Sequence, residues 1–447
     1  MKKYTANDIF GMAMCVAMLI ASFALTFTIS DYYIFNRISQ YGIAFVLSQW
    51  IKKAGIILLP MAIFLKSRNA ADAAKYILPA AVIVSLCTFG DFFDITKTAE
   101  TEAEQFYNSI NLFMPKWLNI LLFSVQSVSC VCACGSLFIK YGFGVKSPLF
   151  LRTLICTFLA VTPLNIFENF FDINDFPADS FWRFYSLSVW HLAAVIILIT
   201  VTVISYLCIK NKNGEGKLYC LRVMAMVLLL QYHSKDSMII GDGYNMYNTL
   251  FSCIPLFICN LGVYVASLTV FLNKKPLYPI SFFVHAAGAI SVFFYFGKDS
   301  LSNYGLFCSY TALYFVFTHC LLFAICVNVV ALKLYIFRIK DCIIPLVYYF
   351  LVIVTASVAS ALVTSYSIEA GLTGSDILYP NYAFTQINPL PFEVPAIFTV
   401  TLWHYDINIL YETGLYIFYV AIFFTFYGLY RIWLALISVI FKKKAVT

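Results

Sequence analysis

The chain has 447 residues, of which 62% are hydrophobic and only 11% are charged, and its mean hydropathy is +0.85. A soluble domain carries roughly 25% charged residues, so this composition excludes a soluble globular protein and indicates an integral membrane protein. The net charge of +7 comes from Lys and Arg in short loops, which suits membrane orientation and argues against nucleic-acid binding.

Apolar stretches long enough to cross a bilayer, about 20 residues each, recur along the whole chain. The first follows Lys2 and Lys3 and lacks a convincing cleavage site, so we expect an uncleaved helix rather than a signal peptide. The polar segment 210–217 is the clearest linker. The predicted spans lie at about 9–29, 52–66, 74–92, 117–140, 148–168, 184–209, 218–233, 249–272, 278–297, 307–333, 342–365 and 409–440.

The distribution of charge between the loops agrees with this set of about twelve helices. Lys and Arg concentrate in every second loop and in the C-terminal tail, whereas the loops between them are mainly acidic. Because positive loops stay on the cytoplasmic side, the alternation predicts a multi-pass protein of the cell membrane with both termini cytoplasmic. The basic positions are Lys66, Arg68, Lys75, Lys140, Lys146, Arg152, Lys210, Lys212, Lys217, Lys274, Lys275, Arg338, Lys340, Lys442, Lys443 and Lys444.

The two halves of the chain share a pattern of spans and loops. Residues 62–69 resemble residues 269–276, each at the exit of the second helix of its half, and a Trp-His pair stands near the last helix of each. Six helices that begin in the cytoplasm, followed by six more, predict a parallel repeat. We therefore expect an all-α polytopic membrane protein with an N-terminal repeat at 1–209, a cytoplasmic linker at 210–217 and a C-terminal repeat at 218–447.

Most of the 14 cysteines lie in apolar runs and are interpreted as small buried hydrophobes. The cluster Cys130, Cys132 and Cys134 has no neighbouring His or acid, and on a helix its middle residue points away from the other two. The sequence therefore predicts no metal site and no cofactor.

Two polar residues in the second half form a candidate nucleophile–base pair. Cys259 lies in the predicted helix 249–272 and His319 in the predicted helix 307–333, each roughly ten to thirteen residues from the same side of the membrane. A thiol and an imidazole at equal depth can meet in a helical bundle, and a polar group so deep is costly. The alternative is that both are packing residues, since cysteine is common in such helices.

The other histidines have structural interpretations. His191 and His404 each follow a tryptophan near the predicted outer face, where such a pair is more often an anchor than a catalyst. His285 stands in mid-helix and is expected to be a core histidine bonded to a neighbouring carbonyl. His233 ends a short span and is either exposed or lines an outer cavity.

Three segments of the second half carry a resemblance to a known family: Ile254-Pro-Leu-Phe-Ile-Cys-Asn260, Thr318-His319, and Pro380-Asn-Tyr-Ala-Phe384 with Pro389 and Trp403 after it. Residues 218–440 thereby resemble the YwaF-type bacterial integral membrane family. That family is related to a eukaryotic membrane family that includes an ether-phospholipid acyltransferase with a Cys/His pair. The chain departs from the pattern at Phe257, where the family often has His. In the first half, Lys52 and Val125 or Gln126 stand near the positions of the pair, so that half is expected to be a degenerate scaffold.

The resemblance implies that Cys259 and His319 transfer a fatty acyl group from a membrane phospholipid through a thioester to a second lipid or to water. Asn260, Asn381 and Tyr382 are candidates for orienting His319 or binding the oxyanion, and His404 is a candidate for binding substrate. Two alternatives stay open: a transporter or flippase of lipids or small molecules, and a non-catalytic membrane subunit.

Overall fold

The computed structural model describes residues 4–26, 43–87, 116–142, 181–241, 255–294, 306–369, 371, 373, 377, 379–380, 382–385 and 395–444. Within these residues the chain is an all-α polytopic membrane protein apart from one short hairpin. The predicted span at 148–168 lies outside the described residues.

The described contacts divide the chain into two compact units. The first comprises Met1–Phe167 and Leu229–Cys253, and the second comprises Glu168–Leu228 and Ile254–Thr447. Helix α11 (Val189–Ile209) packs with helix α17 (Tyr310–Ala331) in the second unit, and the domain boundaries at 209 and 217 stay predictions. The six-plus-six repeat stays a prediction.

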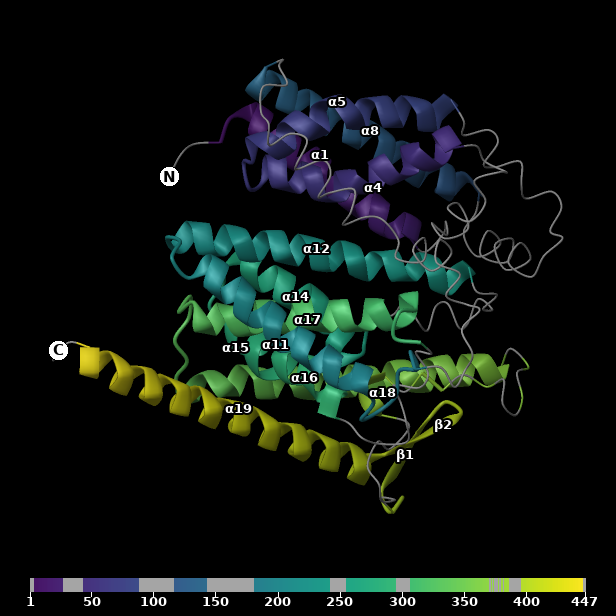
Figure 1. Ribbon diagram of the computed structural model, residues 1–447. Helices are drawn as coiled ribbons and strands as arrows, with labels where there is room; N and C mark the ends of the chain where they lie inside the picture. Colours follow the sequence, from purple (N-terminus) through teal and green to yellow (C-terminus); the bar gives the residue numbers. More distant parts are fainter. Residues whose placement is uncertain are drawn as a thin grey trace. The chain divides into compact units, whose positions relative to one another are not determined.

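In its described residues the first unit contains four helices that pack together and lie side by side in Figure 1, and also the last part of helix α12 (Gly214–Gly241). Small residues line the contacts: Gly55 on one helix faces Leu78 on its neighbour, and a Cβ at Gly55 would already touch the leucine at 3.2 Å. Close approach of helices through small residues is usual in membranes. The helices are α1 (Ala6–Thr26), α4 (Ile43–Ile63), α5 (Arg68–Cys87) and α8 (Lys116–Tyr141).

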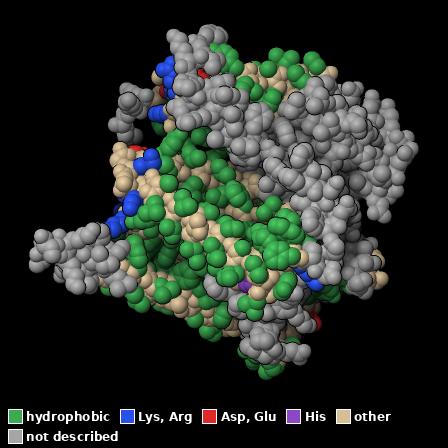
Figure 2. Space-filling model, viewed as in Figure 1, with side chains coloured by type: hydrophobic (Ala, Val, Ile, Leu, Met, Phe, Trp, Pro, Cys, Tyr) green, Lys and Arg blue, Asp and Glu red, His purple; other side chains and the backbone are tan. Residues whose placement is uncertain are grey.

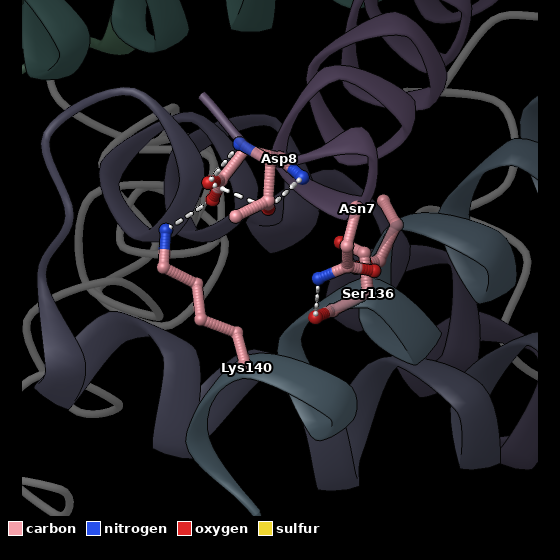
Figure 3. Close-up of polar contacts among 6 residues, drawn as sticks. Asn7, Asp8, Ser136 and Lys140 are labelled. Atoms are coloured by element: carbon pink, nitrogen blue, oxygen red, sulfur yellow. Dashed lines mark hydrogen bonds and ion pairs between the residues drawn. The ribbon is translucent and has the colours of Figure 1, made fainter. Parts of the chain in front are cut away.

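Polar contacts join α1 to α8 at one end of this bundle (Figure 3). Lys140 Nζ lies 2.6 Å from Asp8 Oδ1, and Asn7 Nδ2 donates to Ser136 O at 3.0 Å. Asp8 precedes the apolar run of α1, and the hydrogen bond from Lys140 together with those from Thr5 lowers its pKa to about 2. The exposed end of the bundle is therefore joined by charge-assisted hydrogen bonds.

Charged side chains also lie inside the first unit. Lys75 is 1% exposed, forms an ion pair with Asp72 at 2.9 Å and donates to Gly142 O at 2.6 Å. The span predicted at 52–66 was placed too late, because α4 begins at Ile43 and puts Lys52 in its middle. There the ammonium group lies 3.4 Å from Ser127 Oγ and 3.7 Å from the centroid of the Phe123 ring, contacts that reduce the cost of burying its charge.

The second unit contains longer helices and the one described strand pair. The first part of helix α12 belongs to it, and because α12 begins at Gly214 the second half of the predicted linker, residues 214–217, is helical. Between α14 and α17 lies a single helical segment with a π-helical turn in its middle. Its remaining elements are α12 (Gly214–Gly241), α14 (Ile258–Leu272), α15 (Leu277–Ile280), η3 (Ser281–Ala286), α16 (Ala287–Phe294), η5 (Ile339–Cys342), α18 (Ile343–Glu369), η7 (Tyr382–Phe384), β1 (Thr399–Leu402), β2 (Tyr405–Asn408) and α19 (Ile409–Lys444).

Six helices in the described part of the chain are long and apolar enough to cross a membrane, and four further apolar helices are shorter. Hydrophobic side chains dominate the helix surfaces visible in Figure 2, as lipid-facing surfaces require. In α11 only 22% of the apolar window is buried, so most of that helix faces outward. These features establish a multi-pass membrane protein.

Helix α14 is shorter than the sequence predicts. The predicted span began at residue 249, but residues 255–257 are not helical and the helix begins at Ile258. Pro255 accounts for part of the difference, because proline disfavours helix in the residue before it and lacks an N–H. At its other end α14 stops at Asn273, which adopts the left-handed conformation with φ of 51°.

The hairpin β1–β2 was not predicted. Its strands pair antiparallel from Thr399 with Asn408 to Leu402 with Tyr405, and Trp403 and His404 form the two-residue turn. Threonines and alternating apolar residues favour strands, but the hairpin is too short to stand out from a loop in a membrane-protein sequence.

Candidate functional site

Cys259 occupies the first turn of α14. Phe257 is the N-cap residue, with φ of −72° and ψ of 140°, and Leu261 N donates to Phe257 O at 2.8 Å. Leu261 N is therefore the first intrahelical donor, and the backbone N–H groups of Cys259 and Asn260 lie before it in the first turn of the helix. Partial positive charge at this end favours an anion, including a thiolate.

The thiol itself is partly buried and has a described hydrogen-bond partner. Cys259 Sγ donates to the Oδ1 atom of Asn260 at 3.7 Å. The structure places the amide oxygen of Asn260 on the thiol, and its role in orienting His319 or binding an oxyanion stays a prediction. The contact holds the thiol at the N-terminal end of the helix.

His319 lies in the middle of α17 and is 6% exposed. Its Nδ1 atom lies 2.7 Å from Phe315 O, a carbonyl that can only accept. The neutral ring therefore carries its proton on Nδ1 and a lone pair on Nε2, which is the form that a general base requires. The rings of Phe315 and Phe293 lie against it, with centroids at 4.3 and 6.0 Å.

Contacts with α12 place the C-terminal ends of α14 and α17 near one another. Arg222 donates to Val270 O and Phe271 O at 2.9 and 3.1 Å, and Lys217 donates to Leu332 O at 3.4 Å. Basic side chains satisfy terminal carbonyls and interact favourably with the helix dipole. Counted back at 1.5 Å per residue, Cys259 and His319 each lie about 20 Å from these ends.

Contacts with the helical segment between α14 and α17 also bear on the relative depth of Cys259 and His319. Ile258 packs against Gly288 of α16, where an added Cβ would lie 2.7 Å from the isoleucine, and His319 packs against Phe293 of the same helix. Five residues of helix separate the two contact points, about 7.5 Å along the axis. The structure therefore brings the two helices to one stretch of α16, while direct contact of Cys259 with His319 remains a prediction.

Tyr382 reaches the same end of α14. Its side chain is fully buried, and its ring lies 5.6 Å from that of Phe257 in an edge-to-face arrangement. Thr385 holds this turn by donating to Tyr382 O at 2.8 Å and by bonding Ser360 of α18 at 3.3 Å. The segment predicted to belong to the site thus contacts the residue two positions before Cys259. Asn381 lies outside the described residues.

His404 is exposed in the turn of the hairpin. Its Nε2 atom lies 3.3 Å from Glu369 Oε1, and its backbone N–H donates to Ser365 Oγ at 3.0 Å. These contacts join the hairpin to the end of α18. His191, in contrast, is buried: Leu187 N donates to its Nδ1 atom at 2.9 Å, and its Nε2 atom donates to Phe293 O at 2.7 Å, which is a structural role.

His285 is the residue whose importance the sequence did not reveal. The expected bond to a neighbouring carbonyl is confirmed, since His285 Nδ1 lies 2.9 Å from Ile258 O. The sequence did not show that this carbonyl belongs to the residue directly before Cys259. Gly262 and Gly288 were the available signal, because glycines inside apolar helices mark places where another chain segment approaches closely.

Comparison with known proteins gives one match. The model of the TMEM164 family matches residues 184–430, which include Cys259, His319, Tyr382 and His404. No curated protein and no solved structure matches the chain.

Proposed function

Because the chain belongs to the TMEM164 family, a family of membrane proteins, we propose that it is a membrane-embedded lipid acyltransferase in which Cys259 carries the acyl group as a thioester. The observation that carries this proposal is the position of Cys259 in the first turn of a helix only 15 residues long. That helix measures about 22 Å against about 30 Å of hydrocarbon, so its N-terminus ends inside the membrane.

A helix end at this depth is chemically unusual. Free backbone N–H groups within the hydrocarbon region are tolerated only where protein or a water-filled cavity surrounds them. Such ends serve in other membrane proteins as binding places for anionic groups. Here the first turn carries a thiol, which becomes anionic when it acts as a nucleophile.

In the first half-reaction His319 Nε2 takes the proton of the Cys259 thiol, and the thiolate attacks the carbonyl carbon of a phospholipid acyl ester. The tetrahedral intermediate collapses when the lysophospholipid oxygen leaves and takes the proton back from the imidazolium. The products are a Cys259 thioester and a lysophospholipid. The ion pair of thiolate and imidazolium avoids an isolated charge in a medium where one is costly.

The backbone N–H groups of the first turn of α14, which come before the first intrahelical donor Leu261 N, are the proposed donors to the oxyanion. Tyr382 and Asn381 are proposed to line the acyl site through the contact of Tyr382 with Phe257. In the second half-reaction His319 deprotonates a lipid hydroxyl, which attacks the thioester and restores the thiol. Water in place of the hydroxyl would make the protein an acyl hydrolase.

The depth of the site determines how a lipid substrate reaches Cys259. Cys259 lies about 20 Å from the C-terminal end of α14, which leaves about 10 Å to the opposite edge of the hydrocarbon region. A phospholipid carbonyl normally lies near that edge, so the lipid must enter sideways between helices. His404 in the exposed hairpin is proposed to bind the head group.

The arrangement in the membrane is part of the proposal. We infer twelve helices in two parallel repeats, with both termini cytoplasmic in the cell membrane, from the alternation of Lys and Arg between loops. The relation to the YwaF-type family and to the eukaryotic Cys/His acyltransferases rests on the segments around Cys259, His319 and Tyr382.

The test is to trap the acyl-enzyme. Purified protein is incubated with a phospholipid that carries a fluorescent acyl chain, and hydroxylamine-sensitive label is measured on wild type and on Cys259→Ala, His319→Gln and Cys220→Ala. Cys220 is also partly exposed and lies on α12, so it is the matched control. Wild type and Cys220→Ala should be labelled, Cys259→Ala should be unlabelled, and His319→Gln should be labelled about 10²- to 10⁴-fold more slowly.

Absence of label on wild type across several phospholipid classes would contradict the proposal. Label that persists in Cys259→Ala would place the acyl group on another residue. A wild type without label that moves lipid between leaflets would instead support the transporter alternative, and a wild type with neither activity would support a non-catalytic subunit.

A further inference from the structure

The hydroxyl of Tyr349 is a buried polar group without a hydrogen-bond partner among the described residues. Tyr349 lies in α18, and its side chain is fully buried. Burying a hydroxyl without a partner destabilises the folded protein, so such groups are rare and each needs an explanation. A hydroxyl kept at this position inside a membrane protein points to a partner that binds from outside the chain.

Aromatic rings of α19 surround Tyr349. Its ring centroid lies 4.7 Å from that of Tyr419, 5.5 Å from that of Phe423 and 6.1 Å from that of Tyr416, on which it stacks. Tyr416 uses its hydroxyl within the protein, because it donates to Leu346 O at 3.3 Å. Of these two stacked tyrosines, Tyr349 is therefore the one whose hydroxyl is left for a ligand.

One imidazole ring joins α18 to the first turn of α14. His285 lies in the π-helical turn η3, its Nδ1–H donates to Ile258 O at 2.9 Å, and its Nε2 atom accepts from the Tyr348 hydroxyl at 3.1 Å. Ile258 directly precedes Cys259, and Tyr348 directly precedes Tyr349. The ring therefore brings the part of α18 that carries Tyr349 to the part of α14 that carries Cys259.

Tyr419 provides a second link between Tyr349 and Cys259. Cys259 lies within electrostatic range of the Tyr419 hydroxyl, and Tyr419 lies within electrostatic range of the Tyr349 hydroxyl. The turn η3 contacts α14, α18 and α19, the three helices that carry these residues. The hydroxyl of Tyr349 and the thiol of Cys259 thus belong to one region of the second unit.

We propose that the Tyr349 hydroxyl donates a hydrogen bond to the carbonyl oxygen of the lipid acyl group that reacts at Cys259. This inference deepens the proposed function and rests on it. The groups around Tyr349 that are described above are aromatic rings and neutral hydroxyls, which suit an uncharged ester, whereas a charged phosphate among them would be costly. An ester carbonyl only accepts hydrogen bonds, which matches a hydroxyl that has its proton to donate.

The hydrogen bond grows stronger during acylation. When the thiolate adds to the carbonyl carbon, the carbonyl oxygen becomes an oxyanion, and hydrogen bonds to ionised groups are about twice as strong as neutral ones. The Tyr349 hydroxyl keeps its proton throughout, so His319 remains the proposed base and acid. Removal of one oxyanion donor typically lowers kcat by about 10²- to 10³-fold.

The kinetic test compares Tyr349→Phe with Tyr416→Phe in the full-length protein. Both variants keep the ring and remove one hydroxyl from the same stacked pair. Tyr349→Phe should lower kcat for acyl-enzyme formation by about 10²-fold and raise KM by less than about 10-fold, because most of the interaction is gained when the oxygen is charged. Tyr416→Phe should keep kcat near that of wild type. Equal kcat for Tyr349→Phe and wild type would overturn the inference.

Stability separates a ligand-binding hydroxyl from a structural one. In unfolding by SDS in mixed micelles, Tyr349→Phe should unfold at the same SDS fraction as wild type or at a higher one, because it loses no described hydrogen bond within the chain. Tyr416→Phe should unfold at a lower SDS fraction, since it loses the bond to Leu346 O. If Tyr349→Phe were destabilised in the same way, its hydroxyl would have a structural role and the inference would be wrong.

Binding of unreactive lipids gives a readout that does not depend on acyl transfer. In a Cys259→Ala background, the affinity for a phospholipid analogue with a ketone in place of the ester is compared with that for the matching ether lipid, which has no carbonyl. The ketone should bind about 3- to 10-fold more tightly, as expected for one neutral hydrogen bond. Adding Tyr349→Phe should remove this preference, and adding Tyr416→Phe should leave it unchanged.

These readouts distinguish failure of the inference from failure of the proposed function. If wild type forms no thioester but the preference for the ketone depends on Tyr349, acyl transfer is refuted and the carbonyl-binding role of Tyr349 stands. If wild type forms a thioester, and neither its rate nor the ketone preference changes in Tyr349→Phe, the proposed function stands and the inference is wrong.

Discussion

Replacement of Gly262 by Ala tests the packing on which the site depends. The added Cβ would lie 2.9, 3.0 and 3.1 Å from the Nδ1, Cγ and Cβ atoms of His285, a fully buried ring. Overpacking costs about 1–3 kcal/mol, the bond to Ile258 O adds about 1, and the better helix propensity of Ala returns about 1. The free energy of unfolding should therefore fall by about 1–3 kcal/mol.

Unfolding by SDS in mixed micelles measures this change, and Gly428→Ala is the matched control. Gly428 lies in α19 with nothing within 4 Å of its added Cβ, so Ala there should be neutral or stabilise by up to about 1 kcal/mol. The loss in Gly262→Ala should largely disappear in a His285→Ala background, where the ring no longer occupies the space. If Gly262→Ala were as stable as Gly428→Ala, the close contact of α14 with His285 would be refuted.

Three further predictions concern charged groups. Lys75→Met leaves Asp72 buried without its ion-pair partner, so unfolding free energy should fall by about 3–5 kcal/mol, whereas Lys66→Met at an exposed turn should be nearly neutral. The pKa of Asp8 is lowered to about 2, so the contribution of Asp8 to stability is present above the ordinary pKa of 3.8 and is lost as the pH falls toward 2. This contribution should stay below about 1 kcal/mol, because the pair of Asp8 with Lys140 is at the surface. Asp8→Asn should abolish this part of the pH dependence of unfolding. His404→Ala removes an exposed contact with Glu369 and should change stability by less than about 0.5 kcal/mol, but it should raise KM for phospholipid without lowering kcat.

Hydropathy and charge predicted the membrane class and most helix positions, because a bilayer demands long apolar stretches whatever the fold inside it. The predicted span 117–140 matches α8 within a residue or so at each end. Helix ends were predicted less well where the chain stays apolar beyond the helix. Residues before Ile258 are as hydrophobic as those after it, so hydropathy alone had no means of showing that α14 begins there.

The error at α4 has a different cause. The predicted span began at residue 52, which put Lys52 at its end, where charges in membrane helices usually lie. The structure instead buries Lys52 in mid-helix against Ser127 and Phe123 of α8. A charge inside an apolar stretch is compatible with a continuous helix when a neighbouring helix supplies the partners, and those partners lie 75 residues away in sequence.

The candidate site was also predicted only in part, because its contacts depend on how separate helices pack together. The resemblance to one family singled out the segments around Phe257 and Tyr382 without predicting that they touch, and in the structure their rings meet. His285 was correctly interpreted as a histidine bound to a carbonyl, yet the identity of that carbonyl depends on the register between two helices. Gly262 and Gly288 allow α14 and the η3–α16 segment to approach closely at that register. The glycines, rather than the histidine, therefore indicate in the sequence which carbonyl the imidazole ring reaches. A polar residue in a membrane helix is therefore best interpreted together with the small residues on neighbouring helices, because they determine which backbone group it reaches.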